Sequence, residues 1–251
     1  MENIITRYKL TIEYDGTDYC GFQKQTAIEE NSVEEILEEA VFKMTQTKIK
    51  IFVSGRTDAG VHALAQVLHF DLNKKFQPFQ IADALNNHLL GEKISVLKCE
   101  IVDENFHARF GAKMRHYLYK ITNRRAPLAL DKTRSWHVVK NLDIELMKEA
   151  AKFLIGEHDF SSFRDSKCQS QVPIRGIEKI EITKQGDEIL IQISAKSFMH
   201  HMVRNIVGTL FWVGSQKISP NEMQKILSSK DRTKSGPNAP AHGLYFLGAD
   251  Y

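Results

Sequence analysis

Hydrophobic and polar residues are spaced along the chain in a way that predicts two similar halves. In the first half, alternating apolar positions indicate strands near residues 6–15, 49–53, 64–70 and 93–102. Apolar residues at helical spacing indicate a helix over 32–45, begun by a capping box at Ser32, and a second helix over 78–90 that opens on Pro78. Residues 1–105 therefore read as a β-α-β-β-α-β unit.

The same order recurs in the second half. Strands are indicated near 116–123, 180–182, 189–193 and 244–249, and helices after Asp143, over 200–213 and over 219–228. The segments 124–141, 164–175 and 229–243 read as the long loops, and a loop as long as the last is usually functional or disordered. Two split βαβ units of the RRM type, residues 1–105 and 106–251, predict an α+β fold. We expect one continuous, mostly antiparallel sheet with helices on one face and a central cleft for an active site.

Composition is ordinary for a globular protein, with 42% hydrophobic and 26% charged residues. The chain has no apolar run of the length that a membrane helix needs, and its first residues lack the plan of a signal peptide. Its three cysteines are far apart and without CxxC spacing, which indicates a reducing cytoplasm and argues against a disulfide framework or a zinc site. Motifs for binding nucleotide cofactors are absent from the sequence as well. We therefore expect neither a metal nor a cofactor.

Positive charge is concentrated between residues 106 and 135. This stretch holds eight lysines and arginines against one acid, Asp131, and aromatic side chains lie among the cations. Such a pattern favours a phosphate-rich partner whose bases stack on the aromatic rings. A solvated basic face is the alternative.

The most informative run is Ser-Gly-Arg-Thr-Asp-Ala-Gly-Val-His at residues 54–62. It places one carboxylate, Asp58, between Gly55 and Gly60 on a polar turn that joins two predicted strands. Glycines at these points allow a tight turn and close approach of another molecule. Read alone, Asp58 is either a turn former or helix cap, or a reactive carboxylate.

Two further residues gain interest beside Asp58. Arg204 lies in an otherwise apolar predicted helix, where an arginine either extends to water or pairs with a carboxylate. If it pairs, Asp58 is the candidate partner and would stay ionised near neutral pH. Tyr117 and Tyr119 share one face of a predicted strand, as core residues or as a platform for a flipped base.

The chain resembles the TruA-type tRNA pseudouridine synthases over nearly its whole length. The resemblance rests on six blocks in order, of which the run around Asp58 is the most specific. The other blocks are residues 13–25, 106–119, 159–164, 200–208 and 242–245.

The resemblance implies roles for individual residues. Asp58 would be the catalytic nucleophile, Tyr119 would stack on the target uracil, and Arg204 would pair with Asp58. Tyr119 is also a candidate for the base that removes the C5 proton. Arg56 would contact RNA near the flipped nucleotide. The remaining residues expected to bind substrate are Phe106, His107, Arg109, Phe110, Lys113, Arg164 and Leu244.

The reaction implied is isomerisation of uridine to pseudouridine at positions 38, 39 and 40 of the tRNA anticodon stem-loop. Asp58 would either add to the sugar or take a proton from C2′ to give a glycal, and the sequence does not choose between them. By the same resemblance the chain is expected to act in the cytoplasm as a homodimer that binds tRNA, without metal or cofactor.

Two other functions compete with this reading. A non-catalytic RNA-binding protein would use the tyrosines as a stacking platform. A nucleosidase or other hydrolase would use Asp58 to release the free base. The products decide between them: pseudouridine, no product, or free uracil.

Overall fold

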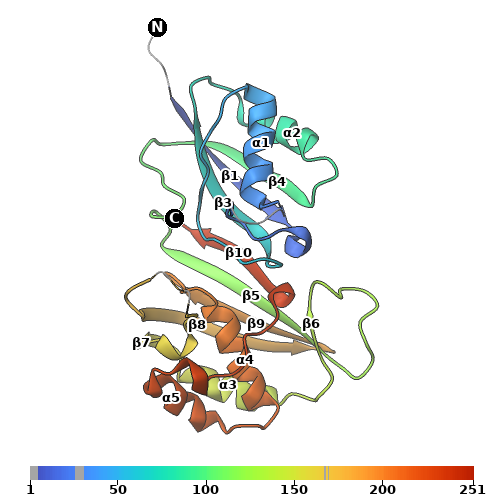
Figure 1. Ribbon diagram of the computed structural model, residues 1–251, viewed down its shortest axis with the longest axis vertical. Helices are drawn as coiled ribbons and strands as arrows, with labels where there is room; N and C mark the ends of the chain where they lie inside the picture. The colour runs from blue at the N-terminus through green and yellow to red at the C-terminus, as the bar shows by residue number, and fades with distance from the viewer. Residues whose placement is uncertain (1–4, 26–30, 167, 169) are drawn as a thin grey trace. The chain divides into compact units, whose positions relative to one another are not determined.

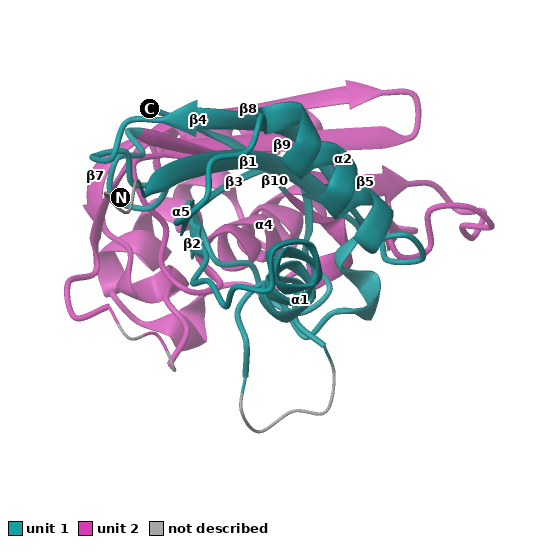
Figure 2. Cartoon of the chain, turned by 90° about the horizontal axis from the view of Figure 1, so that it is seen from above, with its two compact units in different colours: residues 1–113, 246–251 teal, residues 114–245 magenta. Residues whose placement is uncertain are grey.

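The computed structural model describes residues 5–25, 31–166, 168 and 170–251. Within these residues the protein has five α-helices and ten strands in a mostly antiparallel sheet, which confirms the predicted α+β fold. The chain divides into two compact units (Figures 1 and 2). Unit 1 comprises residues 1–113 and 246–251, and unit 2 comprises residues 114–245.

Unit 1 contains the predicted β-α-β-β-α-β order, which Figure 1 shows in blue to green. Its elements are β1 (Thr6–Tyr14), α1 (Val33–Thr45), β2 (Phe52–Val53), β3 (His62–Leu72), α2 (Pro78–His88) and β4 (Ile94–Val102), with the larger part of β10 (Leu244–Asp250). The strands follow the order β4-β1-β3-β10, and the short β2 pairs with β3. The pairs of β1 with β3 and with β4 are antiparallel.

The local sequence explains these elements. Every second residue of β1, from Tyr8 to Tyr14, is buried, as the alternation predicts. The predicted capping box holds the start of α1, where Glu35 donates its amide hydrogen to Ser32 Oγ and its carboxylate accepts one from the Ser32 amide. Pro78 occupies the first turn of α2. Helix α1 packs on α2, and α2 packs on β4.

Unit 2 holds the remaining elements. They are β5 (Met114–Asn123), β6 (Trp136–Val138), α3 (Ile144–Lys152), β7 (Gly156–Asp159), β8 (Ile174–Gln185), β9 (Glu188–Ala195), α4 (Met202–Gly214) and α5 (Pro220–Ser229). Their strands follow the order β5-β9-β8-β7. Asp143 begins α3 as predicted, by accepting hydrogen bonds from the amides of Glu145 and Leu146. Helix α3 packs on β8, α4 and α5.

Three local predictions were wrong or incomplete. The expected loop over 124–141 contains β6, which pairs in parallel with β5. Strand β7 starts at Gly156, where only the end of a helix was expected. Both strands are too short for an alternating pattern to show. Helix α4 begins at Met202 instead of His200, because the backbone of His201 is left-handed, with φ +60°.

None of the helices in the described part of the chain has the length and apolar character that crossing a membrane requires.

Candidate active site

Asp58 lies in unit 1, on the turn between β2 and β3. Its backbone forms an isolated antiparallel bridge with Gly21, and its carbonyl accepts a hydrogen bond of 3.2 Å from the Val61 amide. The turn uses the left-handed φ of Gly60, +76°, as the sequence predicted for a tight turn. Gly21 is required as well, because a Cβ there would lie 2.8 Å from the Thr57 carbonyl oxygen. The Asp58 side chain is half-buried.

A buried polar network joins the start of this turn to β3. Ser54 donates its hydroxyl hydrogen to Gln66 Oε1 over 2.6 Å, and Gln66 Nε2 donates to the Gly55 carbonyl over 2.8 Å. A second contact involves Thr57, the residue before Asp58: its hydroxyl lies 2.7 Å from the hydroxyl of Tyr14 on β1. Burial raises the pKa of Tyr14 to about 12. Gln66 is 0% exposed, and its side-chain amide bonds both Ser54 and Gly55. It therefore restrains the backbone that leads to Asp58.

The supporting role of Gln66 was missed by the sequence analysis. The signal was present, because Gln66 is a polar residue inside a largely apolar predicted strand. A polar side chain at such a position is expected to bond specific groups, since burial without a partner is unfavourable.

A basic and aromatic surface of unit 1 contains most of the residues expected to bind substrate. Phe110 is 78% exposed, and its ring lies 4.5 Å from that of His107 and 5.7 Å from the Arg109 guanidinium. The pKa of Arg56 is lowered by partial burial and by the charge of Arg109. Two cations that repel each other, near the exposed ring of Phe110, suit a polyanion that carries bases. This basic–aromatic surface is defined by Arg56, Phe106, His107, Arg109, Phe110 and Lys113.

The members of this surface differ in exposure. Phe106 and His107 are half-buried, whereas Arg109, Phe110 and Lys113 are exposed. Phe106 packs on Tyr251, with ring centroids 4.9 Å apart. His107 and Phe110 pack on each other. The first residues of the stretch are therefore partly covered, and the later ones face solvent.

Tyr119 lies in unit 2, on β5, and is 0% exposed. Its hydroxyl donates a hydrogen bond of 2.7 Å to the Pro240 carbonyl. Burial raises its pKa, although the charge of Arg204 acts in the opposite direction. Gly243 contacts the ring so closely that a Cβ there would lie 2.6 Å from Tyr119 Cζ. Tyr117 is also buried and packs its ring edge-to-face on Phe198.

Arg204 is half-buried on α4 of unit 2. Its Nε donates to the Ala239 carbonyl over 2.7 Å, and the Ala239 amide donates to the Arg204 carbonyl over 3.2 Å. The Nε bond fixes the direction in which the guanidinium extends, and the backbone bond holds Ala239 beside α4. Asp58 and Arg204 belong to different units, and their pairing stays a prediction.

The two remaining residues expected to bind substrate also lie in unit 2. Arg164 is half-buried and donates to the Cys168 carbonyl over 3.1 Å. Leu244 is buried at the start of β10.

A contact between a histidine and a carboxylate next to α4 was not predicted from the sequence. His201 Nδ1 lies 2.7 Å from Asp165 Oδ2, and the amide nitrogen of Asn238 lies 3.3 Å from the same ring atom. The rings of His200 and His201 stack 3.8 Å apart, although adjacent residues of a helix were not expected to share a face. The left-handed backbone of His201, outside the helix, brings the rings together.

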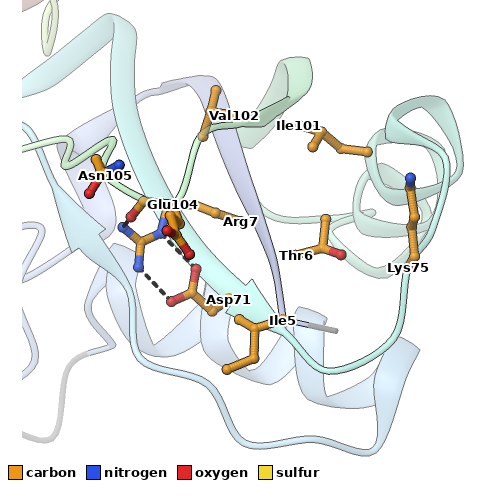
Figure 3. A pocket seen from close by; sticks show the side chains of 9 residues that line it. All are labelled: Ile5, Thr6, Arg7, Asp71, Lys75, Ile101, Val102, Glu104 and Asn105. Carbon is orange, nitrogen blue, oxygen red and sulfur yellow. Dashed lines mark hydrogen bonds and ion pairs between the residues drawn. The ribbon is translucent and has the colours of Figure 1, made fainter. Parts of the chain in front are cut away.

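A separate pocket in unit 1 surrounds Arg7 and contains Lys75, Glu104 and Asn105 among its lining residues (Figure 3). Arg7 forms a bidentate pair with Asp71, with N–O distances of 2.8 and 2.7 Å. It also donates to the carbonyls of Glu104 and Phe106. The guanidinium therefore ties β1 and β3 to the turn after β4, which is a structural task.

Comparison with known proteins gives one family. The sequence model described as tRNA pseudouridine synthase matches residues 10–111 and 150–251. The chain is 50% identical to tRNA pseudouridine synthase A of Paramagnetospirillum magneticum, over 98% of this chain and 95% of that protein. It is 48% identical to tRNA pseudouridine synthase A of Afipia carboxidovorans, over 98% and 99% of the two chains. The protein of that name from Anaplasma marginale is 46% identical, over 98% and 100%.

Proposed function

The chain belongs to the tRNA pseudouridine synthase family, and we propose that Asp58, Tyr119 and Arg204 carry the reaction of that family in this protein. The chain is an isomerase that converts uridine to pseudouridine in tRNA. The observation that carries the proposal is the turn around Asp58, whose backbone is held by buried side chains while its carboxylate is half-buried.

The chemistry requires one bond to break and one to form on the same sugar. The glycosidic bond from N1 to C1′ breaks, the uracil turns, and C5 bonds to C1′. The C5 proton is then lost and N1 gains a proton, so the product is an isomer of the substrate. Because the reaction involves neither net oxidation nor hydrolysis, Asp58 as nucleophile or base needs no cofactor to balance it.

We assign the other two residues to holding the reacting groups. As the resemblance implies, the ring of Tyr119 would supply an apolar face for the uracil. In the structure that ring is 0% exposed and packs against Gly243 and Trp136, so the uracil would have to displace part of this packing to reach it. Arg204 would keep the Asp58 carboxylate ionised, since a cation close to a carboxylate lowers the pKa of that carboxylate. The bonds of Arg204 to Ala239 restrict its guanidinium before substrate arrives.

The basic–aromatic surface is our proposed binding site for the RNA chain. Exposed Arg109 and Lys113 suit phosphates, and Phe110 suits stacking on a base. Arg56, two residues before Asp58, would contact RNA next to the flipped nucleotide. In unit 2, the half-buried Arg164 and the buried Leu244 complete the proposed set.

Four finer assignments are also part of this proposal. The target uridines are those at positions 38, 39 and 40 of the anticodon stem-loop. The enzyme acts as a homodimer, and it does so in the cytoplasm. The division of labour between residues 1–105, with Asp58, and 106–251, with Tyr119 and Arg204, belongs to the same proposal.

Mapping of the product on defined tRNA tests the target positions. Unmodified transcripts would carry uridine at only one of positions 38, 39 and 40, and pseudouridine would be located by carbodiimide adducts that stop reverse transcription. We expect a stop at the single uridine of each transcript. Stops only outside this arm would contradict the assignment of positions, and free uracil among the products would instead support a nucleosidase.

A further inference from the structure

We call the segment 235–240 the strap. Its last three residues each contact one residue of unit 2, namely His201, Arg204 and Tyr119. The Asn238 amide nitrogen lies 3.3 Å from His201 Nδ1. Ala239 exchanges two backbone hydrogen bonds with Arg204. The Pro240 carbonyl accepts the hydroxyl hydrogen of Tyr119. One short segment therefore links α4 to β5 through the two side chains assigned to the reaction in this unit.

The strap lies on one face of α4. Arg204, Gly208 and Thr209 are spaced four and five residues apart along the helix, so they fall on neighbouring parts of its surface. Ala239 contacts Arg204, and Gly236 donates its amide hydrogen to Thr209 Oγ1 over 2.8 Å. The strap thus runs along the helix in the opposite direction to the helix itself.

Two glycines allow this close approach. A Cβ at Gly208 would lie 1.7 Å from the Pro237 carbonyl oxygen, and one at Gly236 would lie 2.4 Å from the Gly208 carbonyl oxygen. Neither distance leaves room for a side chain. The backbones of the strap and of α4 are therefore in direct contact, which leaves little freedom for either to shift.

Arg232 clamps the beginning of the strap. Its guanidinium donates to Ser235 Oγ over 2.7 Å, to the Gly236 carbonyl over 3.0 Å and to Asn205 Oδ1 over 2.8 Å. Asn205 in turn donates to the Phe163 carbonyl. The strap is thus fixed by polar contacts at its first residues and delivers its last three to His201, Arg204 and Tyr119.

We propose that residues 235–240 are a positioning element for the isomerisation, which holds the Arg204 guanidinium and the Tyr119 ring in their reacting geometry. The proposal rests on the proposed function, because it requires Arg204 and Tyr119 to act in the reaction. The strap acts through them and does not itself touch the reacting atoms. Small displacements of positioned groups lower rates strongly, by about 100-fold for a shift of about 1 Å.

Thr209→Val is the first test, because it keeps the shape of the buried residue while removing the acceptor for the Gly236 amide. It also removes the hydroxyl that donates to the Asn205 carbonyl within α4, and the unfolding midpoint reports that loss. We would measure the single-turnover rate of pseudouridine formation at saturating tRNA, the Kd for tRNA, and the unfolding midpoint. The expected result is a rate lowered by about tenfold or more with an unchanged Kd. Thr209→Ser, which keeps the hydroxyl, is expected to restore the rate.

Gly208→Ala is the second test and forces the strap away from α4. Gly176→Ala is its matched control, because a Cβ at Gly176 meets no atom within 4 Å. We expect the first variant to lose rate more strongly than Thr209→Val, and the control to react like the wild type. If Gly208→Ala does not fold, Thr209→Val decides.

Two results would overturn the proposal. A full rate in folded Thr209→Val would make the strap a packing element only. A raised Kd with a full rate at saturation would make it a part of tRNA binding. Parallel measurements on Arg204→Ala and Tyr119→Ala distinguish failure of the proposed function from failure of the strap proposal. If these two variants react normally, the roles assigned to Arg204 and Tyr119 are wrong. If they are inactive and Thr209→Val reacts at the full rate, only the positioning role of the strap is wrong.

Discussion

The hydroxyl of Tyr119 donates its hydrogen to the carbonyl oxygen of Pro240 over 2.7 Å. Because the tyrosine is buried, its pKa is raised and the hydroxyl keeps its proton near neutral pH. In its proposed role, Tyr119 would bring to the reaction a closely packed ring and a hydroxyl that already has a partner. A role as the base for the C5 proton would require that hydroxyl to ionise first.

Tyr119→Phe separates these contributions. We expect the free energy of unfolding to fall by about 1 kcal/mol, because the Pro240 carbonyl loses its donor. The single-turnover rate should fall by about tenfold while tRNA binding stays unchanged, because the link to the strap is lost. In the wild type the rate should stay level between pH 7 and 9. A rate that rises tenfold per pH unit would instead identify the ionised hydroxyl as the base, and a full rate in the variant would exclude the hydroxyl from both roles.

Ser54 and Gln66 should behave as one unit below the Asp58 turn. Each of Ser54→Ala and Gln66→Leu is expected to lower the free energy of unfolding by about 1–3 kcal/mol, because buried polar groups lose their partners. In the double variant the losses should fall short of the sum by about 1 kcal/mol. Chemical denaturation of the four proteins measures this coupling, and strictly additive losses would argue against a shared network.

Arg56 should contribute one phosphate contact. Arg56 is exposed and is repelled by the charge of Arg109. We therefore expect Arg56→Gln to weaken tRNA binding. The slope of log Kd against log salt should fall by roughly 0.7–0.9, the contribution of one phosphate contact. Lys148→Gln, which removes a cation paired with Glu145 on α3, is the control. Equal salt slopes for the wild type and Arg56→Gln would place Arg56 outside the RNA contact.

His69 should make unit 1 sensitive to acid. Burial, with the charges of Arg7 and His107, lowers the pKa of His69 to about 4, below its unfolded value of about 6.5. The unfolded chain therefore binds more protons between these values, so stability is complete above about pH 6.5 and falls by about 2–3 kcal/mol on acidification to pH 4. His69→Gln should flatten this part of the profile, whereas His88→Gln, at the exposed end of α2, should not. An unchanged profile in His69→Gln would contradict the assignment.

Much of the fold could be predicted because its longer elements have strong patterns. Strand β1 alternates over nine residues, and α1 combines a capping box with an apolar stripe. The three residues of β6 carry no such pattern, and their pairing with β5 depends on contacts distant in sequence. The left-handed backbone of His201 was not predicted either, because histidine adopts this conformation only occasionally and the local sequence carries no turn signal there.

The candidate site was predictable where it coincides with a motif, and less so where it depends on packing. Asp58, Arg56 and Arg204 stand in specific blocks of sequence. The role of the strap could not be predicted, because its contacts with Arg204 and Tyr119 are made by backbone atoms. The sequence shows only a loop rich in proline and glycine at this place. The pairing of Asp165 with His201 joins residues 36 positions apart and leaves no local signal.

Asp58 is the residue proposed to perform the isomerisation. The most direct test follows release of tritium from C5 of uracil in unmodified tRNA, with wild-type protein and with Asp58→Asn, which keeps the shape of the side chain but removes its charge. The account predicts release by the wild type without free uracil, and a loss of at least about a thousandfold in Asp58→Asn with tRNA affinity retained. Release at an undiminished rate by Asp58→Asn would contradict it.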